Sequence, residues 1–122
     1  MSNNAGDAIR DCLDAQGLAD QVSGVFGRVP GDPGSMKPNP RLLLDAMEAA
    51  AAAPAECVFI GDAVRDVEAS QAAAIPTIGY ANKPGKAAKL AAAGAVAVVD
   101  ALDQVVLALL LLPGWAHSPK PL

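Results

Sequence analysis

Apolar and polar residues follow two alternating patterns along the chain. Residues 5–16 carry apolar side chains at helical spacing, and Gly17 follows where such a helix would end. Residues 57–60 are four consecutive apolar residues closed by a Gly and an Asp, which is typical of a buried parallel strand. Further helices are expected at 41–53, 64–74, 86–93 and 100–112, and further strands at 22–26, 76–80 and 95–99. This alternation predicts an α/β fold, a doubly wound parallel sheet with flanking helices.

The segment 27–40 interrupts the alternation, because it is rich in Gly and Pro and has no periodic pattern. Structureless stretches of more than about 12 residues are uncommon inside a compact domain unless they bind something or are disordered. We therefore expect this loop to belong to a functional site.

Composition and length favour one domain. The 122 residues are 52% hydrophobic and only 3% aromatic, so small aliphatic side chains must fill one core. We expect that core to occupy residues 1–112 and a loose tail to occupy 113–122. The longest apolar run, 105–112, is far shorter than the roughly 20 residues that cross a bilayer, so it predicts a buried helix and no membrane association. The polar start of the sequence does not resemble a signal peptide, which favours a cytoplasmic location.

The charge and the cysteines exclude further classes. A formal charge of -4 and a pI near 4.7 argue against a nucleic-acid partner, since phosphate backbones are bound by clustered Lys and Arg. Lys83, Lys86 and Lys89 are read as a solvated face. Cys12 and Cys57 belong to no metal-binding motif, and both are expected in or near the core.

Two carboxylates stand where a parallel sheet binds ligands. Asp62 directly follows the strand at 57–60, and Asp66 lies four residues later on the same side of the next helix. Such a pair can hold Mg²⁺, although Asp62 as a helix cap and Asp66 as a solvated first-turn acid is an equal alternative on these residues alone. Lys37, between prolines at the end of the loop, favours the metal reading, because a stiffly held ammonium can bind phosphate or neutralise paired acids.

These residues resemble a known family. KPNP at 37–40, a helix, and VFIGDAVRD at 58–66 have the order and spacing of the third and fourth motifs of the haloacid dehalogenase (HAD)-like hydrolase superfamily, and SNN at 2–4 resembles its second motif. The resemblance covers about residues 2–100. It implies a Rossmann-like core in which Ser2, Asn3 and Lys37 hold phosphate. It also implies that Asp62 binds Mg²⁺, with Asp66 as a second ligand or its supporting partner.

The chain departs from the family at the first motif. Members carry a strand ending in a DxD-type motif, whose first Asp is the nucleophile, and the 122 residues contain no DxD. Asp7, Asp11 and Asp14 lie in or at the start of a helical pattern instead. We therefore expect the C-terminal part of a HAD-like core, inactive in isolation. Unpaired strand edges would then favour a homo-oligomer, a complementing chain, a domain swap, aggregation or a sheet rearranged to close the gap.

Three functions follow from this reading. The leading one is a Mg²⁺-dependent phosphate-monoester phosphatase acting on a small phosphorylated metabolite. The alternative is a non-catalytic module that binds a phosphorylated ligand or a partner. A phospho-acceptor receiver domain is disfavoured, because Lys37 precedes Asp62 and no acidic pair follows the first strand.

Overall fold

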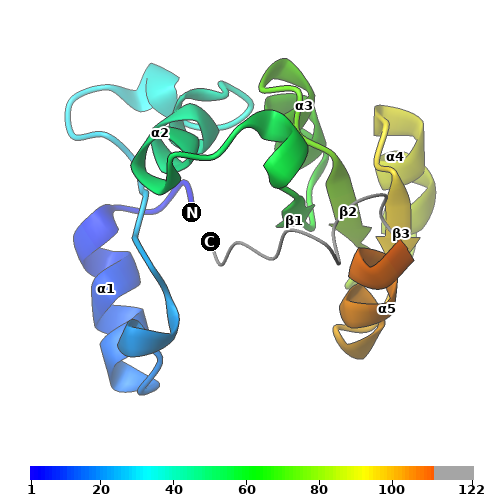
Figure 1. Ribbon diagram of the computed structural model, residues 1–122, viewed down its shortest axis with the longest axis horizontal. Helices are drawn as coiled ribbons and strands as arrows, with labels where there is room; N and C mark the ends of the chain where they lie inside the picture. Colours follow the sequence, from blue (N-terminus) through cyan, green and yellow to red (C-terminus); the bar gives the residue numbers. More distant parts are fainter. Residues whose placement is uncertain (112–122) are drawn as a thin grey trace.

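The computed structural model describes residues 1–111, and its centre is a parallel sheet (Figure 1). Strands β1 (Phe59–Gly61), β2 (Thr77–Tyr80) and β3 (Ala97–Val99) lie in the order β1-β2-β3. Ile60 pairs with Ile78, and Gly79 pairs with Val98. The predicted parallel α/β architecture is confirmed.

Five α-helices accompany the sheet in the described residues. They are α1 (Gly6–Ala15), α2 (Arg41–Ala50), α3 (Val64–Ala72), α4 (Lys86–Ala93) and α5 (Asp103–Leu111). Short 3₁₀ turns lie at Ala19–Gln21, Pro33–Ser35 and Pro54–Glu56. The expected helices are thus all present: α4 has the expected bounds, and the other four begin or end at other residues than expected.

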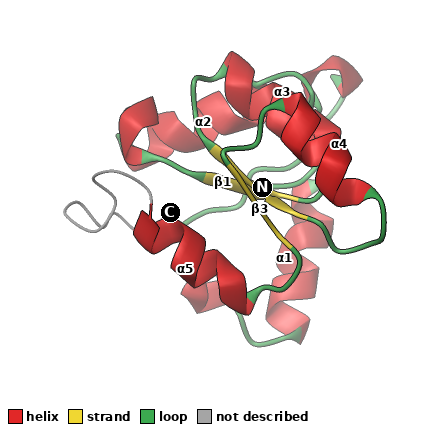
Figure 2. Cartoon of the chain, turned by 90° about the vertical axis from the view of Figure 1, so that its right-hand side faces the viewer, coloured by secondary structure: helices red, strands yellow, loops and turns green. Residues whose placement is uncertain are grey.

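Helices cover both faces of the sheet (Figure 2). On one face, the Thr77 side chain of β2 contacts Ser70 of α3, and the next residue on that face, Gly79, lies against Leu90 of α4. On the other face, Ile78 packs in a buried cluster with Val105 and Ala108 of α5. Successive residues of β2 therefore face opposite layers, as the pleat of a strand requires.

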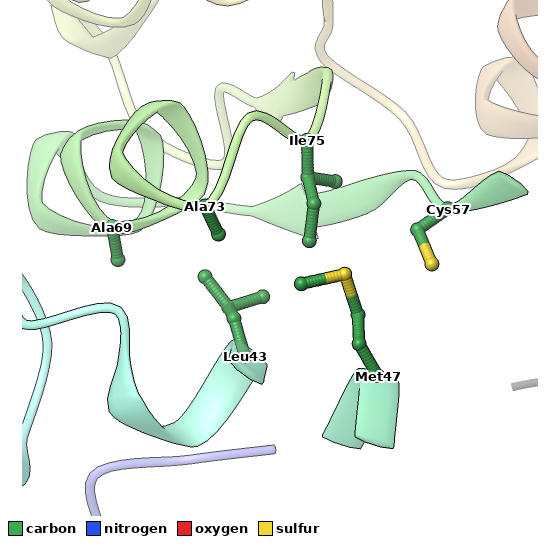
Figure 3. Packing of buried hydrophobic residues seen from close by; sticks show 6 residues of the cluster. All are labelled: Leu43, Met47, Cys57, Ala69, Ala73 and Ile75. Atoms are coloured by element: carbon green, nitrogen blue, oxygen red, sulfur yellow. The ribbon is translucent and has the colours of Figure 1, made fainter. Parts of the chain in front are cut away.

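A second buried cluster fixes α2 against α3 (Figure 3). Its members are apolar and are exposed by 9% or less: Leu43, Met47, Cys57, Ala69, Ala73 and Ile75. Full burial of a Leu, Met or Ile side chain contributes roughly 1.5–3 kcal/mol each. Because α2 directly follows the Gly- and Pro-rich loop, this packing also holds the end of that loop beside α3.

The strand expected at 22–26 is wrong. The described residues there form no strand, and the nearest pairing is one isolated parallel bridge between Ala5 and Arg28. Backbone hydrogen bonds from Ser2 N to Phe26 O (3.0 Å) and from Arg28 N to Asn4 O (2.8 Å) tie the two segments together. Ser23 and Gly24 have low strand propensity, and a pair of short extended segments is too small to form a regular ladder.

The last helix differs from expectation at its start and in its burial. It begins at Asp103, and Asp100 is not its N-cap, because the chain first turns after β3 and Asp100 N donates to Gln104 Oε1 (3.3 Å). Only Val105 and Ala108 of α5 are buried, whereas Leu107 is 63% exposed and Leu111 is 85% exposed. The helix covers the sheet with one side only, so the expected full burial is wrong.

The expectation that both cysteines lie in or near the core is confirmed for only one of them. Cys57 is buried as predicted, but Cys12 is exposed, because α1 buries none of its residues. No helix in residues 1–111 has both the length and the apolar character that crossing a membrane requires. The tail expected at 113–122 lies outside the described residues.

Candidate functional site

A polar pocket of about 380 Å³ opens where β1 ends. Its wall combines the N-terminal segment, the end of the Gly- and Pro-rich loop, the residues after β1 and the first turn of α3. The charged and polar side chains among its lining residues are Ser2, Asn3, Asn4, Lys37, Asp62, Arg65, Asp66 and Tyr80. All five predicted site residues therefore line one pocket, at the sheet edge where parallel α/β folds bind ligands.

Lys37 and Asp66 form a buried ion pair in this pocket. The Lys37 Nζ lies 2.6 Å from Asp66 Oδ1, and the two side chains are only 9% and 4% exposed. The ammonium also stands 5.4 Å from the centroid of the Phe59 ring, within the range of a cation–π contact. Each buried group thus has an opposite charge in direct contact, which offsets part of the cost of removing it from water.

Asp66 has two structural contacts. Its Oδ1 accepts the Lys37 ammonium, and its Oδ2 accepts the backbone N–H of Ala63 (3.0 Å), the N-cap of α3. The capping role that the sequence left open therefore falls to Asp66, in the first turn of α3, and not to Asp62. A direct metal bond from Asp66 would compete with both contacts, so its role as ligand stays a prediction.

Asn3 holds the backbone on which Lys37 is carried. Its Oδ1 accepts the Lys37 N–H (2.9 Å), and its Nδ2 donates to the Lys37 carbonyl (3.4 Å). Ser2 is nearby, and its hydroxyl accepts the Asn4 N–H (3.1 Å). The three residues assigned to phosphate by resemblance are thus brought together, and Asn3 also positions the lysine.

Asp62 stands at the carboxyl end of β1 with its side chain 47% exposed. Its Oδ2 accepts hydrogen bonds from Asn82 Nδ2 (3.1 Å) and Lys86 Nζ (3.4 Å). Burial alone would raise the pKa of Asp62, but the Lys86 charge and these hydrogen bonds outweigh it and lower the pKa. The carboxylate is therefore ionised at neutral pH and accessible from the pocket.

The site fits a weakly held hard cation. No group of three or more His, Cys, Asp or Glu side chains gathers for a metal within residues 1–111. Mg²⁺ does not require such a cage, because it usually keeps several waters and takes one or two carboxylates together with substrate phosphate. The ionised, half-exposed Asp62, which lines the same pocket as Lys37, is a carboxylate of the kind that such coordination uses.

Three important residues were not identified from the sequence. A Cβ on Gly61 would lie 2.5 Å from the Asp66 Cβ, so the close approach of α3 to β1 requires glycine there. Gly61 could have been identified from the sequence, because it directly precedes Asp62. Lys86 was read as solvated and Asn82 carried no pattern, because their contact with Asp62 depends on the packing of α4.

Known proteins resemble this chain in sequence. A family model described as HAD-hydrolase-like matches residues 35–105, which is more than half of the chain and includes Lys37, Asp62 and Asp66. A phosphoglycolate phosphatase from Xylella fastidiosa is 45% identical over 42 residues, which span 34% of this chain and 18% of that protein.

Solved structures show the same fold. A predicted phosphatase from Clostridium acetobutylicum superposes with a TM-score of 0.81 at 23% identity, over 90% of this chain and 50% of that one. A HAD family hydrolase from Deinococcus radiodurans, solved with bound phosphate and sodium, has a TM-score of 0.73 at 26% identity, over 98% and 52%. The chain thus spans about half the length of these solved relatives. The similar proteins named above include phosphatases. The family match, the motifs and the fold together show that the chain belongs to the HAD-like hydrolase family.

Proposed function

We propose that this chain supplies the phosphate-binding and cation-binding side of a Mg²⁺-dependent phosphatase for a small phosphorylated metabolite. The observation that carries the proposal is the convergence of Lys37 and Asp62 on one polar pocket at the end of β1. A phosphate monoester needs a cationic group for its oxygens and a carboxylate for the metal that neutralises its charge, and the pocket offers both.

The contacts and burial of each residue suggest its role in binding. Lys37 is buried and held by Asp66 and Asn3, so its ammonium is preorganised to donate to a phosphate oxygen. Ser2 lies at the same wall and has a hydroxyl that can donate to the phosphoryl group. Asp62 would hold Mg²⁺, which, when bound, neutralises charge on the phosphoryl oxygens.

We propose further that these 122 residues do not turn over substrate by themselves. The sequence contains no DxD motif, and Asp7, Asp11 and Asp14 lie exposed on α1, outside the residues that line the pocket. The Lys37 Nζ is engaged by Asp66 at 2.6 Å and is therefore not free to act as the nucleophile. Within residues 1–111, the pocket therefore has groups for binding phosphate but no carboxylate in the DxD setting of the family's nucleophile.

The direct test is phosphate release from p-nitrophenyl phosphate with MgCl₂. We expect the purified chain to release no more phosphate than buffer does, because nucleophile and acid–base group act as a unit in this chemistry. The matched control is Asp62→Ala, which should show the same background. Release by the wild type that disappears in Asp62→Ala would contradict the proposed inactivity and would point to a nucleophile within the chain or within a second copy.

A second candidate function, binding of a partner chain, has its own support. β1 pairs only with β2 in the described residues, so its other edge has unpaired backbone groups. A mainly apolar groove of about 310 Å³, whose lining includes Phe26, Met47 and Val58, adjoins this edge. An unpaired edge beside an apolar groove is a template for another strand, from a second copy or a complementing chain.

This candidate predicts association in solution. Light scattering should show a wild-type mass above that of the monomer, rising with protein concentration. Ile60→Lys, which places a charge on the 41%-exposed residue at the β1 edge, should shift the mass toward the monomer. Leu107→Lys on the outer side of α5 removes comparable apolar surface and should leave the mass unchanged. A wild-type monomer at all concentrations, or an equal response to both variants, would contradict pairing through β1.

A further inference from the structure

We propose that Asn82 and Lys86 are positioning residues that hold the Asp62 carboxylate for a divalent cation. The inference rests on the proposed function, because it assigns the metal to Asp62. Both side chains donate to the same oxygen, Oδ2, at 3.1 Å from Asn82 Nδ2 and 3.4 Å from Lys86 Nζ. Neither residue belongs to the sequence motifs that define the rest of the site.

The two donors reach Asp62 from outside the pocket. Asp62 lines the pocket, whereas neither Asn82 nor Lys86 is among its lining residues. Asn82 lies in the connection between β2 and α4, and Lys86 is the first residue of α4. They therefore restrain the carboxylate from outside the pocket and leave its pocket side accessible to an ion.

Restraint matters here because the Asp62 side chain is only half buried. Its side chain is 47% exposed, and the other carboxylate of the site, Asp66, is fixed by Lys37 and the Ala63 N–H. A half-exposed carboxylate samples several rotamers unless hydrogen bonds select one. Two converging donors make that selection, so the cation meets a carboxylate that is already oriented.

Lys86 also has an opposing effect, since its positive charge repels a cation bound to Asp62. The Lys86 side chain is 29% exposed, and the interaction of such a solvent-screened charge with a partner changes a binding constant by about fivefold at most. Loss of a hydrogen-bond partner that orients a metal ligand costs about 10–100-fold in metal affinity. Orientation therefore outweighs repulsion, and removal of Lys86 should weaken cation binding.

The test uses Mn²⁺ as the probe and the broadening of backbone amide signals in NMR spectra of the whole chain as the readout. Wild-type chain should show selective broadening around Gly61, Asp62 and Ala63. Asn82→Ala and Lys86→Met should each raise the Mn²⁺ concentration needed for that broadening by about tenfold. Lys86→Arg, which keeps the charge and a donor, should restore most of the affinity. Lys83→Met removes a neighbouring exposed lysine and is the matched control for charge.

The outcomes separate this inference from the proposed function. If wild type binds Mn²⁺ at Asp62 but Asn82→Ala and Lys86→Met bind it equally well or more tightly, positioning is overturned while the metal site stands. If Mn²⁺ causes no selective broadening at Asp62 in the wild type, both are overturned. Urea unfolding midpoints equal to wild type in the variants would assign a tenfold loss to the site and not to unfolding.

Discussion

Replacing Lys37 with Met is expected to destabilise the fold by about 3–5 kcal/mol, the cost of leaving one partner of a buried ion pair uncompensated. Asp66, which is 3% exposed in the wild-type structure, would lose its ammonium partner, and of its two donors only the Ala63 N–H would be left. Because small domains are stable by about 5–15 kcal/mol, this loss consumes a large share of the total. Urea unfolding followed by circular dichroism measures it.

Two control variants distinguish the loss of the ion pair from the loss of a positive charge. Lys89→Met removes an exposed lysine and should change stability by less than about 0.5 kcal/mol. The double variant Lys37→Met/Asp66→Leu removes both charges and should cost much less than the sum of the single variants. A Lys37→Met cost as small as that of Lys89→Met would show that Lys37 and Asp66 are not paired as described.

Replacing Gly61 with Ala is expected to displace Asp66. The new Cβ would lie 2.5 Å from the Asp66 Cβ and 2.6 Å from its Oδ2, distances that real side chains do not tolerate. Overpacking of this kind costs about 1–3 kcal/mol, and any weakening of the Lys37 pair adds to it. Urea unfolding gives the cost, and the NMR shift of the Lys37 side chain reports the change at the pair.

Gly34→Ala is the matched control for this variant. A Cβ on Gly34 would meet only Asp32 Oδ1 at 3.4 Å, an ordinary contact, so its cost should be near zero. If Gly61→Ala is as stable as Gly34→Ala and leaves the Lys37 signal unchanged, the close packing of α3 on β1 is wrong.

Local signals made much of the fold predictable. Helix α4 has the predicted bounds, Lys86–Ala93, because Gly85 and Gly94 adopt positive φ angles of 85° and 114° at its two ends. The helix expected at 41–53 ends earlier, at Ala50, because Ala51 adopts a left-handed conformation that favours glycine and gives no sign in the sequence. Helix ends marked by Gly or Pro can be predicted from the sequence, whereas a helix end at an alanine in a left-handed conformation cannot.

Residues of the candidate site were identifiable where they lie in recognisable local sequence motifs. Asp62, Asp66 and Lys37 were identified from their place beside a strand or in a stiff loop, and the structure brings them together. The partners of Asp62 were not identifiable, because Asn82 and Lys86 reach it only after β2 and α4 have packed. The exposed side of α5 was missed for the same reason, since an unbroken apolar run gives no indication of which side faces the sheet.

The central claim is that Lys37 and Asp62 form one phosphate and cation site, and titration of the chain with inorganic phosphate in the presence of Mg²⁺ tests it most directly. Amide shifts should concentrate at Asn3, Lys37, Gly61 and Asp62, and omission of Mg²⁺ or the change Asp62→Ala should weaken them. Shifts scattered over the surface, or none at these residues, would contradict the assignment of this pocket.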